Sequence, residues 1–248
     1  MRRILPALLV LLLAAPANAD EPDLTLTGTA GRARRDAAAE RVYLTHTALT
    51  SPAGTVTGDL RAPFYPGVLA TARGALTDRI EVALSGVAAV KLDPVYGGHV
   101  KVQLLRGSSA AVAAALGIYG GYTYGSADGD VAYLPSLALS VCSTPDCRVL
   151  LGLHVDGVLF GGADHRIVFG GVSLASGGRH QFLLELHAGG EHDEADTEHE
   201  RSMVGGFIGA RFSGPRFSTD IGLAFGWSKG LHGIGGAPYP ALGVSSRL

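Results

Sequence analysis

Apolar and polar residues alternate along most of the chain beyond residue 50. The clearest stretch is 216–226, where Phe217, Ile221 and Leu223 share one parity and Asp220 has the other. Alternation of this kind predicts a β-strand with one apolar face and one small or polar face. Similar alternation surrounds Val100 and Leu153.

Turn residues separate these stretches and predict twelve strands, with no room for crossover helices. The predicted strands are 55–63, 67–76, 79–90, 98–106, 109–124, 130–141, 147–160, 166–175, 179–189, 201–212, 216–226 and 238–247. Short connections such as Gly107-Ser108 alternate with longer ones such as Trp227 to Ala237. This is typical of an outer-membrane barrel. We therefore predict an all-β fold, an antiparallel up-and-down transmembrane β-barrel of about 12 strands, with 10 or 14 as alternatives.

The alternation alone does not decide whether the apolar parity faces lipid or the core of a soluble barrel. Many aromatic residues fall near the longer connections, which favours an aromatic girdle at a membrane interface. They are Phe64, Tyr65, Tyr96, Tyr119, Tyr122, Tyr124, Tyr133, Phe160, Phe169, Trp227 and Tyr239. Residues 107–127 carry no charge, so a membrane helix is an alternative there, although their glycines disfavour it.

The first residues have the pattern of a secretory signal peptide, with Arg2 and Arg3, an apolar core, and Ala17-Asn18-Ala19 as the cleavage site. We expect a signal peptide at 1–19, an N-terminal periplasmic extension or partial plug at 20–51, and the barrel at 52–248. Removing two arginines leaves 18 basic against 22 acidic residues, a net charge of −4 that does not favour nucleic acid.

Three segments resemble uncharacterised, porin-like outer-membrane β-barrel proteins of bacteria. They are Pro52-Ala53-Gly54-Thr55, the turn from Gly74 to Val82, and Tyr122-Thr123-Tyr124-Gly125, within a resemblance over roughly residues 50 to 190. It implies a barrel in the outer membrane of a Gram-negative cell and carries over no catalytic residues. Such barrels usually end in an aromatic residue, whereas this chain ends in Ser246-Arg247-Leu248.

Charged and histidine side chains on the other parity are expected to face the lumen. They are Asp59, Arg61, Arg73, Arg79, Glu81, Lys101, His154, Asp156, Arg179, Glu185, His187, Arg216 and Asp220. Their mixed signs favour a narrow lumen with weak ion selectivity. Cys142 and Cys147 bracket a short turn, and an exported chain favours a disulfide between them.

No catalytic motif, cofactor fingerprint or metal-binding motif stands out. The acidic, histidine-containing run Gly190 to Glu200 is expected to be a solvated outer loop. We therefore expect a narrow porin-like pore or structural barrel that is not an enzyme, contacts outer-membrane lipid and the barrel assembly machinery, and passes small solutes or ions. The alternatives are a barrel hydrolase acting on lipid or peptide and a soluble exported β-barrel that binds an apolar ligand.

Overall fold

The computed structural model describes residues 28–64, 67–89, 92–122, 130–160, 165–193, 201–229 and 238–248. Within these ranges, one helix, α2 (Gly28–Arg35), precedes twelve strands. The strands are β1 (Val56–Phe64), β2 (Gly67–Ala75), β3 (Ile80–Ala89), β4 (Leu92–Arg106), β5 (Ala110–Tyr122), β6 (Asp130–Cys142), β7 (Val149–Phe160), β8 (His165–Gly177), β9 (His180–Asp193), β10 (Arg201–Ser213), β11 (Phe217–Lys229) and β12 (Tyr239–Arg247). The signal peptide expected at 1–19 lies outside the described residues.

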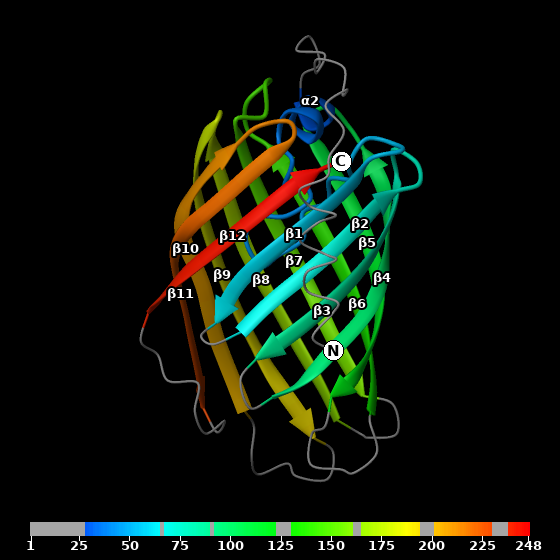
Figure 1. Ribbon diagram of the computed structural model, residues 1–248, viewed down its shortest axis with the longest axis vertical. Helices are drawn as coiled ribbons and strands as arrows, with labels where there is room; N and C mark the ends of the chain where they lie inside the picture. Colours follow the sequence, from blue (N-terminus) through cyan, green and yellow to red (C-terminus); the bar gives the residue numbers. More distant parts are fainter. Residues whose placement is uncertain are drawn as a thin grey trace.

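The strands form one closed antiparallel barrel in which each strand pairs with its neighbours in sequence (Figure 1). The first and last strands close it, with Thr57 opposite Arg247 and the Leu248 amide donating to the Val56 carbonyl at 2.8 Å. The predicted twelve-stranded up-and-down barrel is confirmed. The 14-strand alternative is wrong, because Arg41 to Thr50 adds no strand to the wall.

Two strands are longer in the structure than in the prediction, in each case at the end next to a longer connection. β4 begins at Leu92 rather than 98, and β9 continues to Asp193 rather than ending at 189. The pairs Gly97-Gly98 and Gly189-Gly190 read as turns in the sequence, yet both lie within the hydrogen-bonded ladder. A ladder is made by backbone groups, so paired glycines weaken a strand without ending it.

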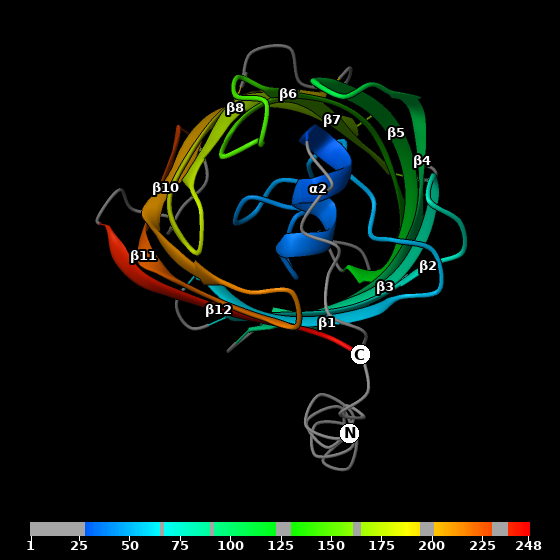
Figure 2. The ribbon, with the colours of Figure 1, turned by 90° about the horizontal axis from the view of Figure 1, so that it is seen from above.

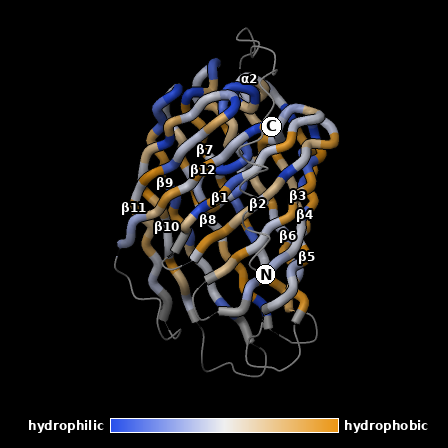
Figure 3. Tube along the Cα trace, viewed as in Figure 1, coloured by the Kyte–Doolittle hydropathy of each residue, from blue (hydrophilic) through white to orange (hydrophobic). Residues whose placement is uncertain are grey.

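The apolar parity of the strands faces outward and the polar parity faces inward. Leu153 and Ile221 are about half exposed on the outer surface, whereas Glu185 and Asp220 are fully buried inside. This is the reverse of a soluble barrel and is the arrangement of a membrane-spanning one. Hydrophilic residues concentrate at the end of the barrel where α2 lies (Figure 3).

The uncharged stretch 107–127 is mostly strand β5, so the membrane-helix alternative is wrong there. No helix among the described residues is long and apolar enough to cross a membrane.

Among the described residues, which leave out Tyr65 and Tyr124, the expected aromatic girdle is only partly present. Tyr96, Tyr133 and Trp227 are exposed near the longer connections, as expected. Tyr119 and Phe169 are only partly exposed and border a cavity inside the barrel, which Trp227 borders as well. The rings of Tyr119 and Phe169 therefore contribute to the interior rather than to a girdle, which their positions near the longer connections did not indicate.

Residues Gly28 to Ser51, here called the inner segment, lie inside the ring of strands (Figure 2). Its helix α2 sits at the end with the short turns, and the chain then enters the lumen before leaving to begin β1 (Figures 1 and 2). Most of these residues are buried, including Tyr43, Ala48 and Leu49. Small inward side chains such as Ala111 and Ala113 belong to the same buried cluster. They leave the room that the inner segment occupies.

Candidate functional site: the barrel interior and its inner segment

The short turns hold helix α2 across the mouth of the barrel. The Gly28 amide donates to the Pro145 carbonyl at 2.8 Å, and the Thr29 amide donates to the Ser108 carbonyl at 3.1 Å. Further along, the Ala37 amide donates to the Gly214 carbonyl at 2.9 Å. Three separate turns therefore accept hydrogen bonds from the inner segment, and the first two of these bonds satisfy amides that the N-terminus of α2 leaves without partners.

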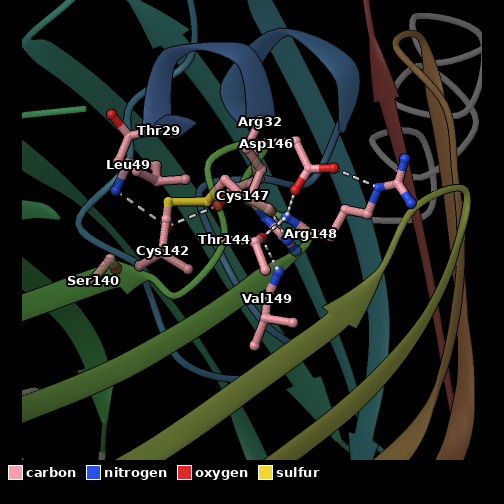
Figure 4. Close-up of a disulfide and its surroundings, with 12 residues drawn as sticks. Thr29, Arg32, Leu49, Ser140, Cys142, Thr144, Asp146, Cys147, Arg148 and Val149 are labelled. Carbon is pink, nitrogen blue, oxygen red and sulfur yellow. Dashed lines mark hydrogen bonds and ion pairs between the residues drawn. A yellow bond between two sulfur atoms is a disulfide. The ribbon is translucent and has the colours of Figure 1, made fainter. Parts of the chain in front are cut away.

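A disulfide joins Cys142 and Cys147 in the turn between β6 and β7 (Figure 4). The same turn holds two arginines of α2. Arg32 Nη1 donates to the Cys147 carbonyl at 3.0 Å, and Arg35 Nη2 donates to the Asp146 carbonyl at 2.6 Å. The disulfide thus shapes a turn that contacts the inner segment directly.

Arg211 of β10 is the central cation of the interior. Its guanidinium contacts Asp220 Oδ1 at 2.7 Å and Asp36 Oδ2 at 3.3 Å, and it donates to the Ala38 carbonyl at 3.0 Å. Burial alone would raise the pKa of Asp36, but Arg211 and Arg32 hold it well below its ordinary range. The Asp36 carboxylate is therefore ionised at neutral pH.

A second group of ion pairs joins the inner segment to β1, β2 and β11. Arg41 Nη1 lies 2.6 Å from Asp220 Oδ2. Arg73 bridges Glu40, at 2.6 Å, and Asp59, at 2.9 Å. The two acidic wall residues of these pairs also have partners on the wall. Asp59 pairs with Arg61 of the same strand, and Asp220 pairs with Arg211 of the neighbouring strand β10.

On the neighbouring strands, Lys101 of β4 lies 3.0 Å from Oε1 of Glu81 of β3 and donates to the Leu49 carbonyl at 2.7 Å. Gln103 Nε2 donates to the Ala48 carbonyl at 2.8 Å. These two side chains hold the part of the inner segment that returns toward β1.

The charges of this network balance. The wall contributes four cations and four anions, and the inner segment contributes two of each. None of the twelve is more than 4% exposed. They are Arg61, Arg73, Lys101, Arg211, Asp59, Glu81, Glu185 and Asp220 of the wall, and Arg32, Arg41, Asp36 and Glu40 of the inner segment. Buried charges are tolerated when they are paired and hydrogen-bonded, as most of these are.

The tip of the inner segment is a tight turn that receives the carboxylate of Glu185. The Val42 amide donates to the Thr45 carbonyl at 3.0 Å across the turn. The Tyr43, Leu44 and Thr45 amides and the Thr45 hydroxyl all donate to Glu185. Successive amides pointing at one anion form a backbone nest, and here the anion comes from the wall of the barrel.

An aromatic stack fixes the same turn laterally. The Tyr43 ring stacks on Phe207 with ring centroids 4.0 Å apart, and its hydroxyl donates to the Leu242 carbonyl at 2.9 Å. A Cβ atom at Gly209 or Gly222 would lie 2.5 or 2.7 Å from Cζ of Phe207. Only glycine leaves room for the ring at these two wall positions.

Histidines gather beyond the tip, toward the longer connections. His187 Nδ1 lies 3.2 Å from His154 Nε2, and His154 Nε2 lies 3.6 Å from Asp156 Oδ2. His46 of the inner segment packs edge-on against His99 of β4, with ring centroids 4.9 Å apart. His46, His99, Asp156 and His187 border a cavity of about 520 Å³.

Three residues expected in the lumen lie elsewhere. Arg79, Arg179 and Arg216 are exposed residues in short turns just before β3, β9 and β11. Their parity continues the strand pattern, but the ladder begins one residue later in each case. The other ten expected residues lie on strands with buried or partly buried side chains.

Sequence reasoning missed Arg211 and the four charges of the inner segment. Arg211 lies in the predicted strand 201–212, two positions from the inward Gly209. Parity counted along that strand would have placed it inside. The inner-segment charges fall in a stretch without periodicity, and nothing in their spacing indicates which wall residue each one meets.

The acidic run 190–200 is also partly different from the expectation. Residues 190–193 continue β9, and Glu191 is buried rather than solvated. Residues 194–200 lie outside the described residues.

Comparisons with known proteins support the fold. No family model matches the chain, and no curated protein matches it either. Among solved structures, the KdgM porin in complex with disordered oligogalacturonate matches with a TM-score of 0.51, 6% identity, and coverage of 77% of this chain and 98% of that chain. OprD from Pseudomonas aeruginosa matches with a TM-score of 0.43 and 16% identity over 73% of this chain, which spans 59% of OprD. LpxR from Salmonella typhimurium gives a TM-score of 0.48 and 9% identity, covering 78% of this chain and 99% of that chain. At these identities the likeness to KdgM shows a porin-type barrel fold and nothing about substrate.

Proposed function

We propose that the protein is an outer-membrane β-barrel whose inner segment acts as a plug, so that it forms a narrow porin-like pore that is closed at rest. One observation carries the proposal: eleven charged side chains of the wall and the inner segment form ion pairs in the lumen, and Glu185 binds the tip of the inner segment, all with almost no exposure to water. A solute cannot pass that level while the inner segment stays there. Passage of small solutes or ions therefore requires the inner segment to move.

The charges that remain on the wall describe the open state. Within the network, the four cations and four anions of the wall balance without the inner segment, so the field at that level of an opened lumen has little net sign. Opening also separates buried partners such as Arg41 and Asp220 and breaks the hydrogen bonds between the tip and Glu185, which favours the closed state. We expect rare openings of low conductance with slight ion selectivity.

The outward apolar face, with residues such as Leu153 and Ile221, would contact outer-membrane lipid. The barrel assembly machinery would insert the chain, and the proposal includes no cofactor and no nucleic acid. We also propose that the protein is not an enzyme. Glu185, the acidic neighbour of His187, already accepts hydrogen bonds from three amides and a hydroxyl, which leaves it poorly suited to act as a base.

Planar-bilayer recording of the purified full chain tests this function. Brief, small and weakly selective steps are expected. Large and steady steps with strong selectivity would refute a plugged, balanced lumen. In parallel, cleavage of lipid or peptide substrates is measured for the wild type and for His187→Ala. Turnover that disappears in His187→Ala would replace the pore by a barrel hydrolase.

A further inference from the structure

We propose that the outer half of the lumen contains a binding site for a small uncharged molecule with an apolar body and a hydroxyl group, of the size and character of a phenol. The site is the cavity of about 520 Å³ that lies beyond the tip of the inner segment. Its volume is within the ordinary range for small-molecule sites, about 300–1,000 Å³. The floor is formed by Leu44, Thr45 and His46 of the tip.

Most of the cavity wall is apolar, which favours an apolar ligand body. Leu134, Phe169 and Met203 supply large side chains from β6, β8 and β10. Ala115 and Gly117 of β5 are small and leave the space open. A Cβ atom at Gly117 would lie 2.8 Å from the Tyr119 ring, so this part of the wall has no room for a larger residue.

Imidazole nitrogens supply the polar part of the site. His99 is only 8% exposed, and its Nε2 has no hydrogen-bond partner among the described residues. Its Nδ1 lies 3.5 Å from the Tyr119 hydroxyl. The Nδ1 atom of His46, in the adjoining ring, is likewise buried without such a partner in the described part of the chain. A hydroxyl both donates and accepts, so it satisfies a neutral imidazole in either tautomer.

The charge around the cavity favours an uncharged ligand. Burial, with the nearby His99, Arg73 and Lys101, lowers the pKa of His46 well below its ordinary value, so this imidazole is neutral. Arg73 and Lys101 are paired with acidic residues rather than directed at the cavity. An anionic ligand would lose its hydration here without gaining a counter-charge, and a cationic ligand would have only the Asp156 carboxyl group, among the described residues, as a counter-charge. Among the described residues, no group of three His, Cys, Asp or Glu could hold a metal ion.

Calorimetric titration of the refolded full chain in detergent with phenol, and with toluene as the matched molecule without a hydroxyl, tests the site. Saturable binding of one phenol per chain is expected. Ala115→Phe fills the cavity and should weaken phenol binding at least about tenfold, whereas Ala114→Phe makes the same change on the outer face and should leave it within about twofold. If Ala115→Phe does not fold, Met203→Trp fills the cavity from β10 and should have the same effect.

His99→Phe tests the hydroxyl. It keeps a ring of similar size but removes both nitrogens, so phenol should bind about five- to tenfold more weakly while toluene binding stays within about twofold. Heats that do not saturate, or equal phenol binding by Ala115→Phe and Ala114→Phe, would overturn the site. Equal losses for phenol and toluene in His99→Phe would overturn the hydroxyl requirement. Because binding is measured at equilibrium without a bilayer, this result is independent of whether the barrel conducts.

Discussion

Replacing Glu185 by glutamine should release the tip of the inner segment while changing almost no volume. The carboxylate accepts hydrogen bonds from the Leu44 amide at 2.9 Å, the Thr45 amide at 3.1 Å and the Thr45 hydroxyl at 2.8 Å. Glutamine keeps one acceptor oxygen, loses the charge, and places an NH₂ group where a carboxylate oxygen accepted. Hydrogen bonds to a charged group contribute about 1.5–3 kcal/mol each, against about 0.5–1.5 kcal/mol for neutral ones.

We therefore expect Glu185→Gln to weaken docking of the tip by about 2–3 kcal/mol, which is roughly a 30- to 150-fold shift from closed to open. Single-channel recording measures this as the open probability. Asp146→Asn is the matched control, because it makes the same chemical change at an exposed turn, where the Asp146 carboxylate pairs with Arg148 and is hydrogen-bonded to the Arg148 amide and to Thr144. An open probability for Glu185→Gln within about twofold of the wild type and of this control would refute the role given to the nest.

Three further predictions concern His46, the outward face of the barrel and the disulfide. His46 is neutral when the inner segment is docked, but its imidazole has an ordinary pKa near 6.5 once the segment is displaced. The displaced state therefore binds more protons, and recordings should show more opening as pH falls from about 7 to 5. An unchanged pH response in His46→Leu would exclude this residue as the cause. Leu223→Arg, on the outward face, should lower the free energy of unfolding by up to about 2–4 kcal/mol, measured by urea unfolding from lipid vesicles. Phe217→Arg, on the same face but beside a short turn, should cost at most about 1 kcal/mol. Equal effects would contradict the placement of Leu223 deeper in the membrane than Phe217. Replacing both Cys142 and Cys147 by serine should lower stability by about 2 kcal/mol, as expected for a cross-link closing a short loop, and no loss in the same unfolding assay would contradict that estimate.

The wall of the barrel could be predicted from the sequence because its pattern is local. The alternation around Ile221 indicates a strand and groups the residues that share a face, since every second side chain points the same way, although it does not by itself tell which face meets lipid. The turn positions limit where each strand ends. Errors arose where a residue continued the parity beyond the ladder, as Arg79 and Arg216 do, and where paired glycines such as Gly97-Gly98 looked like a loop.

The contents of the lumen could not be predicted in the same way. The inner segment has no regular period, and its contacts join residues far apart in the chain, such as Arg41 with Asp220 and Tyr43 with Phe207. Two signals did point to it. Alanines at inward positions of the wall, such as Ala111 and Ala113, leave space that something must fill. The mixed charges of the wall also required partners, and pairing across an empty lumen is only one way to supply them.

Hydrogen exchange followed by mass spectrometry on the folded full chain tests the central claim most directly. Peptides that contain the Tyr43, Leu44 and Thr45 amides should exchange slowly, because those amides donate to a buried carboxylate inside the barrel. Glu185→Gln should speed exchange in these peptides while peptides from β5 and β7 stay as protected as in the wild type. Rapid exchange across residues 36–51 in the wild type, with the strands protected, would contradict an inner segment docked in the lumen.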